Sequence, residues 1–342
     1  MAPIAIISFS ILIGVLLGSG AALLAGGPSG GSHIEYHPGV IVTKQVVQEV
    51  DPHSLPPIVV HPASCSIQVA KLREFTLPAS PSSWVFVDRR DRLVFQANRK
   101  LIRYTPESGQ HQETTVPPGW KLLAVGGSDN LYFQDQGEAN LFEANWSEPQ
   151  LIASWTKPVP KVFAVTVDDA DLAYIWPLNQ SGIEVYSRSG SHVGKIPTFD
   201  AAMDHNLSAD PRYGLLLADS SMHSLTAVDR KGFEREVMPE GRVDPTEPSK
   251  MLSYPFAVQE DADKLVWVSN DWGMDKRPDM AVIDLGARRF ARVAWGDHLK
   301  ELEIENTDDL ATFLISPTKH VLFACLNGRA TMGEYEYRVK WK

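Results

Sequence analysis

The chain has 342 residues, of which 44% are hydrophobic and 22% are charged, and its formal net charge is -10. Such a composition supports a substantial buried core, and the length suits two domains or one large all-β domain. No cluster of Lys or Arg occurs, which argues against nucleic acid or an anionic lipid surface as the main partner. The two cysteines, Cys65 and Cys325, are too few for a disulfide framework.

The N-terminal segment is strongly apolar. Residues 1–32 contain no charged side chain, and residues 4–25 are almost wholly apolar. As a helix this run would be roughly 33 Å long, enough to span the hydrocarbon core of a bilayer. We therefore expect residues 1–27 to form a transmembrane anchor or an uncleaved signal segment. A signal peptide cleaved near Ala22 is the alternative; the missing basic n-region and the length of the run favour the anchor.

Small residues recur at every fourth position of this segment, namely at Ser10, Gly14, Gly18 and Ala22. In a helix they lie on one face, where small side chains let a second helix approach closely in lipid. The pattern therefore favours helix–helix packing, with a copy of the chain or another membrane protein as partner. Gly and Ala are also common in membrane helices without such packing, and that reading stays open.

Residues 28–66 are interrupted by prolines at positions 38, 52, 56, 57 and 62. This spacing breaks helices and central strands, so it predicts an extended, semi-stiff Pro-rich linker between the anchor and a folded domain. We expect a single-pass membrane protein whose domain lies on the exocytoplasmic or periplasmic side. No Lys or Arg flanks the apolar run before Lys44, so the charge rule for topology gives no guidance.

A strand–turn–strand unit then recurs to the C-terminus. Its clearest part is a second strand with large apolar residues two positions apart, beginning at Leu93, Leu131, Leu172, Leu215, Leu265 and Val321. Successive spacings are 38, 41, 43, 50 and 56 residues. A repeat of about 40 residues with several short strands is typical of a β-propeller. We predict an all-β fold, a six-bladed β-propeller at residues 67–342.

The sixth predicted blade is one strand short at the C-terminus. An unclosed ring would expose a sheet edge, so residues 67–77 are expected to supply the missing outer strand. This closure places Cys65 and Cys325 in one blade on strands that are not neighbours. A disulfide would require Cys65 to fold across the edge, whereas a buried free thiol at Cys325 needs no such rearrangement.

Short turns rich in Asp, Gly, Asn and Pro join the first and second strands of each predicted blade. They fall at residues 88–91, 126–130, 168–171, 208–213, 259–264 and 316–320. Their carboxylates resemble metal ligands, but their repetition in nearly every blade favours a structural role in the turns.

The longest insertions, residues 239–253, 270–279 and 296–309, all flank blades four to six and are expected on the opposite face. Long loops on a rigid scaffold commonly carry binding sites. One insertion combines aromatic and charged candidates for binding, which are Asn270, Asp271, Trp272, Lys276 and Arg277. The alternative is that these insertions have no function.

The expected first strand of blade four carries Asp204, His205 and Asn206 where other blades have apolar residues. Polar side chains are costly on a channel-lining strand unless they are solvated or functional. They are the candidate catalytic residues, as an acid/base pair or a cation ligand set at the channel mouth. A strand that begins later, beside a water-filled channel, is the simpler alternative.

Residues 255–270 read PFAVQEDADKLVWVSN: an apolar strand, an acidic turn, then Leu-x-Trp-Val. This pattern resembles the blade core of six-bladed propellers of the NHL and lactonase-like kind, and the likeness extends loosely over residues 84–337. The resemblance implies a channel in which lactonase-like enzymes hold a divalent cation on Glu, Asn and Asp. Asp204 and Asn206 match such ligands by residue type.

Strong catalytic motifs such as HExxH, GxSxG or a Gly-rich phosphate loop are absent from the sequence. We therefore expect a membrane-anchored propeller that acts as a binding or scaffold subunit of a larger membrane-associated assembly. Its partners would be proteins, and neither a metal nor another cofactor is expected. The alternative is a channel-centred, metal-dependent hydrolase of the lactonase-like kind.

Overall fold

The computed structural model describes residues 36–37, 40–41 and 58–342, with gaps inside the last range. These gaps are residues 83, 136–137, 150, 152, 160, 179–180, 201–204, 220–223, 239–254, 272–277, 305–309 and 327–329. The predicted anchor, residues 1–27, with Ser10, Gly14, Gly18 and Ala22, lies outside the described residues. Within the described part of the chain, no helix is long and apolar enough to cross a membrane.

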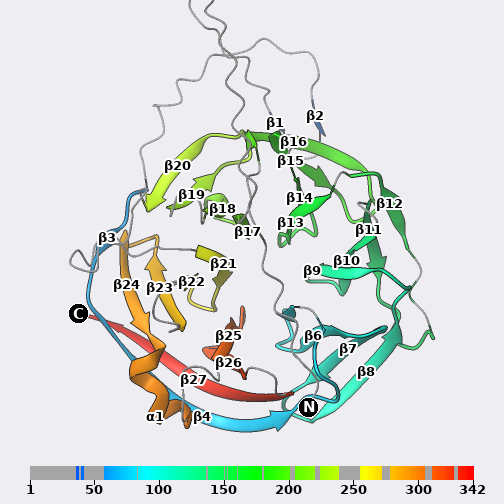
Figure 1. Ribbon diagram of the computed structural model, residues 1–342. Coiled ribbons are helices and arrows are strands. Elements are labelled where there is room, and N and C mark those ends of the chain that lie inside the picture. The colour runs from blue at the N-terminus through cyan, green and yellow to red at the C-terminus, as the bar shows by residue number, and fades with distance from the viewer. Residues whose placement is uncertain are drawn as a thin grey trace, which may run out of the picture. The chain divides into compact units, whose positions relative to one another are not determined.

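Six sheets, each built on four antiparallel strands, are arranged around a central axis (Figure 1), which confirms the all-β fold and the six-bladed propeller. Blade one contains β5 (Val85–Val87), β6 (Leu93–Ala97), β7 (Lys100–Thr105) and β8 (Gln110–Thr115). Blade two contains β9 (Lys121–Val125), β10 (Asn130–Asp135), β11 (Glu138–Glu143) and β12 (Trp155–Lys157). Blade three contains β13 (Val162–Val167), β14 (Ala173–Pro177), β15 (Ser181–Tyr186) and β16 (His192–Asp200).

The second half of the ring repeats this order. Blade four contains β17 (His205–Asp210), β18 (Gly214–Asp219), β19 (Ser224–Val228) and β20 (Glu234–Met238). Blade five contains β21 (Pro255–Glu260), β22 (Val266–Asp271), β23 (Pro278–Asp284) and β24 (Arg289–Ala294). Blade six contains β25 (Leu310–Ile315), β26 (Val321–Leu326) and β27 (Thr331–Trp341), with β4 (Cys65–Thr76) outermost.

The described structure also contains a short ribbon and two short helices. A two-stranded ribbon joins β1 (Tyr36–His37) to β2 (Val40–Ile41). The 3-10 helix η2 (Trp295–His298) and the one-turn α1 (Leu299–Leu302) follow β24.

Blade six is closed by strands from the two ends of the folded region. β4 pairs antiparallel with β27 over eleven Cα pairs, from Thr331 opposite Thr76 to Trp341 opposite Cys65. Cys65 is a free thiol, and burial raises its pKa while the charge of Lys342 opposes that shift. Because β27 lies between β4 and β26, Cys65 and Cys325 sit on strands that are not neighbours.

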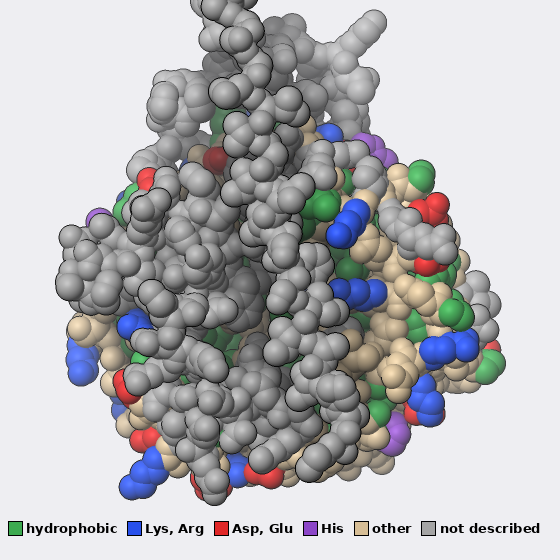
Figure 2. All heavy atoms as spheres, in the orientation of Figure 1, with side chains coloured by type: hydrophobic (Ala, Val, Ile, Leu, Met, Phe, Trp, Pro, Cys, Tyr) green, Lys and Arg blue, Asp and Glu red, His purple; other side chains and the backbone are tan. Residues whose placement is uncertain are grey.

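The strand order defines two faces of the ring. Turns between the first and second strands, and between the third and fourth, lie on what we call the turn face. Connections between the second and third strands, and between blades, lie on the loop face. Figure 2 shows basic side chains right of centre, over blades two and three.

The apolar core is divided into six clusters in the described structure, one between each pair of neighbouring blades. Middle strands such as β6 are buried along their whole length, because neighbouring blades cover both of their faces. This burial explains the apolar second-strand pattern in the sequence, which differs from the alternation of a half-exposed strand.

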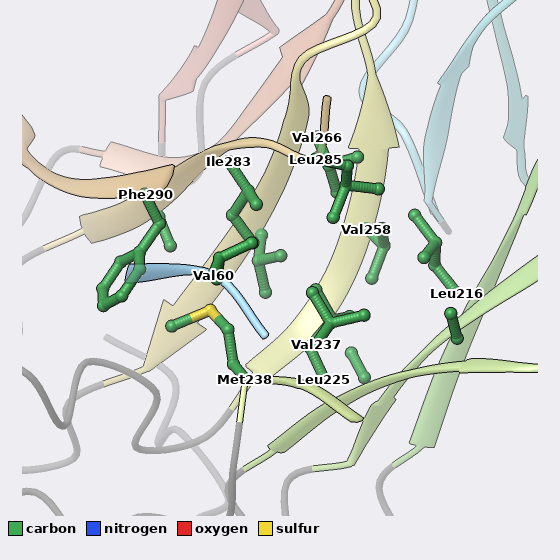
Figure 3. Packing of buried hydrophobic residues seen from close by; sticks show 14 of the residues in the cluster. Val60, Leu216, Leu225, Val237, Met238, Val258, Val266, Ile283, Leu285 and Phe290 are labelled. Carbon is green, nitrogen blue, oxygen red and sulfur yellow. The ribbon is translucent and has the colours of Figure 1, made fainter. Parts of the chain in front are cut away.

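The segment before β4, within the range expected for the linker, packs on blades four and five. The backbone amides of Ile58 and Val60 donate to the carbonyls of Glu236 and Val237 at 3.1 and 3.0 Å. β3 (His61–Pro62) then pairs parallel with β24 as a fifth strand of blade five. Figure 3 shows Val60 among Val237, Met238, Ile283 and Phe290. Ile58 and Val60 are only 4% and 3% exposed, so this segment fastens two blades together.

Candidate functional site

The central channel is a candidate site in the described structure. Its volume is about 680 Å³, and residues of all six blades line it. Apolar side chains of the inner strands contribute to the wall, among them Val85, Leu123, Val165, Leu207, Val258 and Ile315. Volumes of about 300–1,000 Å³ are typical of pockets for small molecules.

The turn carboxylates on the turn face are used structurally. Asp88 Oδ1 accepts hydrogen bonds from the amides of Arg90 and Arg92, at 2.8 and 3.0 Å. Asp168 and Asp261 accept the same pair of bonds from the residues two and four positions later. An Asp that captures its own turn amides stabilises the turn, as its repetition in the sequence suggested.

The last position of several turns adopts a left-handed backbone. Asp91, Asp129 and Asp171 have φ values of 56°, 63° and 58°, and Gly214, at the end of the turn of blade four, has a φ of 97°. Asp, Asn and Gly tolerate this conformation better than other residues. Lys264 takes this place in the turn of blade five with a φ of 63°, although it is not Asp, Asn or Gly, and its side chain pairs with Glu260.

Bonds between blades also form on the turn face. Arg92 bridges Asp88 in its own turn and Asp129 of blade two, with Nη2 2.7 Å from Asp129 Oδ1. Ser316 and Thr318 of blade six donate to Asp91 of blade one. These contacts hold neighbouring blades in a fixed relation and occupy the carboxylates that could otherwise bind a cation.

Arg89 crosses the turn of blade two and pairs with Asp169 of blade three. A Cβ atom on Gly127 would lie 2.7 Å from the Arg89 guanidinium, so the glycine makes room for this crossing. All three residues line the channel on the turn face.

Glu260 is the channel-lining carboxyl group with the strongest perturbation among those described. Its Oε1 lies 2.6 Å from Lys264 Nζ, and its Oε2 lies 3.3 Å from Arg212 Nη2. Burial raises its pKa to about 7, the hydrogen bond and charge of Asp210 add to the shift, and Lys264 opposes it. Burial alone would raise the pKa of Asp210, but hydrogen bonds, chiefly from Arg212, lower it.

We expect Glu260→Gln to remove a pH dependence of stability. Between pH 4.5 and about 7 the folded Glu260 keeps a proton that the unfolded chain has released, so the free energy of unfolding falls as pH rises through this window. One pKa unit corresponds to about 1.4 kcal/mol; after discounting for solvent screening, we expect the variant to be more stable than the parent by about 1–2 kcal/mol at pH 8.

The measurement is thermal melting of the parent and the variant from pH 5 to 8. Glu336→Gln is the control, because Glu336 is an exposed carboxylate on β27 that pairs with Arg338 outside the channel. Parallel pH profiles for parent and Glu260→Gln would contradict the prediction.

The candidate residues from the sequence fall largely outside the described parts. His205 and Asn206 begin β17, and Asn270 and Asp271 end β22, but only their backbone is described. Asp204, Trp272, Lys276 and Arg277 lie outside the described residues. β17 runs from His205 to Asp210 and is the inner strand of blade four. The described residues contain no group of three His, Cys, Asp or Glu arranged to hold a metal.

Other channel residues were not singled out from the sequence. Trp84, Lys121 and Lys161 stand at the start of the inner strands of blades one to three, at the loop-face end of the channel. Trp84 is 56% exposed, which is unusual for a large aromatic side chain in the described part of this protein. The sequence does carry a signal for these residues, since a polar or aromatic residue stands directly before each inner strand. That such residues share one end of a channel becomes apparent only in the folded ring.

Comparison with known proteins shows the fold alone. No family model and no curated protein matches the chain. Virginiamycin B lyase from Staphylococcus aureus is 11% identical with a TM-score of 0.52, over 80% of this chain and 99% of that one. A protein of unknown function from Bacteroides thetaiotaomicron is also 11% identical, with a TM-score of 0.52 over 80% of this chain and 77% of that one.

A chain of the mitotic checkpoint complex is 8% identical with a TM-score of 0.53, over 86% of this chain and 99% of that one. These solved structures differ in what their names say they do, and fold likeness at such identities does not transfer function. The resemblance to six-bladed propellers seen in residues 255–270 is confirmed as a statement about architecture, and the chain is similar in fold to such propellers.

Proposed function

We propose that the chain is a membrane-anchored propeller that acts as a binding or scaffold subunit of a larger membrane-associated assembly. The supporting observation is that the three long connections of blades four to six all leave from one face. They join β20 to β21, β22 to β23, and β24 to β25, and strand direction puts each on the loop face. The ring beneath is rigid, because its turn carboxylates are bonded within and between blades.

Membrane attachment and location are part of the proposal. The apolar residues 4–25 support an anchor, and a domain on the exocytoplasmic or periplasmic side follows the sequence reasoning above. The chain enters β4 on the turn face, since Cys65 pairs with Trp341 at the end of β27. The loop face lies opposite this entry point and is the proposed surface for a protein partner.

The double change Trp272→Ala, Arg277→Ala is expected to weaken partner capture at least ten-fold, because aromatic and Arg anchors dominate interface energies. The partner is identified by affinity capture of the full chain from its native membranes and quantified by mass spectrometry. The matched control is Arg90→Ala with Lys231→Ala, two exposed positions on the turn face. Melting temperatures should stay equal. Undiminished capture by the loop variant, with loss in the control, would place the interface on the turn face.

A channel-centred hydrolase is the second candidate, and Glu260 favours it. A channel carboxyl with a pKa of about 7 is suited to general acid–base chemistry near neutral pH. Asp204, His205 and Asn206 would supply the cation site. Metal analysis of the purified full chain separates the two functions: stoichiometric Ca²⁺ or Zn²⁺ that is lost in Asp204→Ala would support the hydrolase over the scaffold.

A further inference from the structure

The channel has the dimensions of a binding site for an elongated small molecule. Inner strands such as β13 have six residues, so the channel wall extends about 20 Å at 3.3 Å per residue. A volume of about 680 Å³ spread along it makes a narrow bore. Val, Leu, Ala, Phe and Ile side chains contribute apolar surface along the wall, beside a nearly equal share of polar surface. Burial of an apolar body there is favoured by the hydrophobic effect.

The two ends of the channel differ in their charges. On the turn face the basic side chains are paired, Arg89 with Asp169 and Lys264 with Glu260. At the loop-face end, Lys121 and Lys161 are exposed, and neither forms an ion pair with any residue in the described ranges. The positive end is notable in a chain whose net charge is -10. It gives the channel one cationic mouth.

Two further side chains at this mouth, those of Gln134 and Trp84, can contact a bound molecule. Gln134, whose Cα lies opposite Lys121 in the sheet, has a buried side-chain Nε2 without a hydrogen-bond acceptor among the described residues. A buried amide donor without a partner is costly, so an incoming acceptor would be favoured. Trp84 lines the same end and presents its indole, an apolar surface with a polar edge.

We propose that the channel binds a small amphiphilic carboxylate, with its alkyl or aromatic body between the inner strands and its carboxylate at Lys121 and Lys161. Trp84 packs on the body where it enters, and Lys121 and Lys161 select a single negative charge. The orientation follows from the unpaired cations, which are present only at the loop-face end of the described channel. This proposal is independent of the protein partner proposed above.

The test is equilibrium dialysis with biphenyl-4-carboxylate, using the full chain in phosphatidylcholine nanodiscs and empty nanodiscs as background. We expect saturable binding of one molecule per chain. Biphenyl-4-carboxamide, which keeps the shape and loses the charge, is expected to bind about ten-fold more weakly, and benzoate, which is too short to fill the channel, more weakly still.

The decisive variant is Lys121→Gln with Lys161→Gln, which changes only exposed charges and should leave melting unaltered. It is expected to bind the carboxylate about ten-fold more weakly and the carboxamide as before. Lys231→Gln with Lys340→Gln removes the same charge from exposed positions on outer strands and turns, and should bind like the parent. Absence of saturable binding, equal binding of carboxylate and carboxamide, or unchanged binding in the Lys121/Lys161 variant would each overturn the proposal.

Discussion

Asp261→Ala is expected to lower the free energy of unfolding by about 3–5 kcal/mol, because it removes a buried carboxylate that accepts hydrogen bonds from several donors. The Asp261 carboxylate accepts from the indole of Trp267 at 2.9 Å, from the hydroxyl of Tyr337 at 2.8 Å, and from two turn amides. Asp261 is 1% exposed, and Trp267 and Tyr337 are 0% and 2% exposed. The truncation would leave both ring donors buried without a partner.

The same carboxylate joins two blades, since Trp267 lies on β22 of blade five and Tyr337 on β27 of blade six. Their rings form an edge contact with centroids 5.3 Å apart. Burial and the charge of Asp261 raise the pKa of Tyr337, so its hydroxyl stays protonated and donates. Loss of Asp261 should therefore loosen the contact between blades as well as one turn.

Asp229→Ala is the matched control, measured alongside by urea unfolding. Asp229 accepts from the amides of Lys231 and Phe233 in the same turn geometry, and no side-chain donor to it is recorded in the described structure. We expect a loss of about 1 kcal/mol there, the usual value of such local bonds. Equal losses in the two variants would show that the contact between blades five and six through Asp261 contributes nothing.

A chain that begins at residue 78 is expected to lose cooperative unfolding altogether, because it lacks the strand that closes blade six. Removal of β4 breaks eleven registered pairs and exposes the edge of β27. It also removes Ile67 and Val69 and so uncovers the apolar cluster between blades five and six, against which they pack. Such a loss is comparable to the whole stability of a typical domain.

Two shorter truncations separate closure from the preceding segment. A chain that begins at residue 58 should melt close to the full chain, since among the described elements it loses only the short β1–β2 ribbon and keeps Ile58 and Val60. A chain that begins at residue 64 loses Ile58 and Val60 but keeps β4, and should melt about 5–10 °C lower. If the chain that begins at residue 78 melts like the others, the closure of the ring by β4 is refuted as a source of stability.

The repeat pattern made the fold predictable, because local composition decides each part of it. Apolar pairs such as Leu93 and Phe95 recur where a middle strand is buried on both faces, and Asp or Gly recurs where a tight turn must form. The missing outer strand of blade six followed from counting strands, since a ring cannot leave one sheet incomplete.

The candidate site was less predictable, because its members are separated in sequence. Arg89 meets Asp169 across 80 residues, and the pKa of Glu260 is raised by burial in the ring, to which Asp210 of the neighbouring blade adds. The prolines around Ile58 and Val60 indicated a linker, yet the apolar side chains of these two residues are buried where blades four and five meet. Such contacts depend on which blades are neighbours and on where each residue lies along the channel axis. A local sequence pattern contains neither piece of information.

The sequence by itself determined the six-bladed architecture, the structural role of the turn aspartates and the loop face on which the long insertions lie. These properties follow from short-range rules of strand burial and turn geometry, repeated six times. Only the tertiary structure decided that Asp261 joins blades five and six, and that Lys121, Lys161 and Trp84 share one mouth of the channel. Ring closure brings these residues together, because all inner strands begin at the same end of the channel and their first residues form its rim.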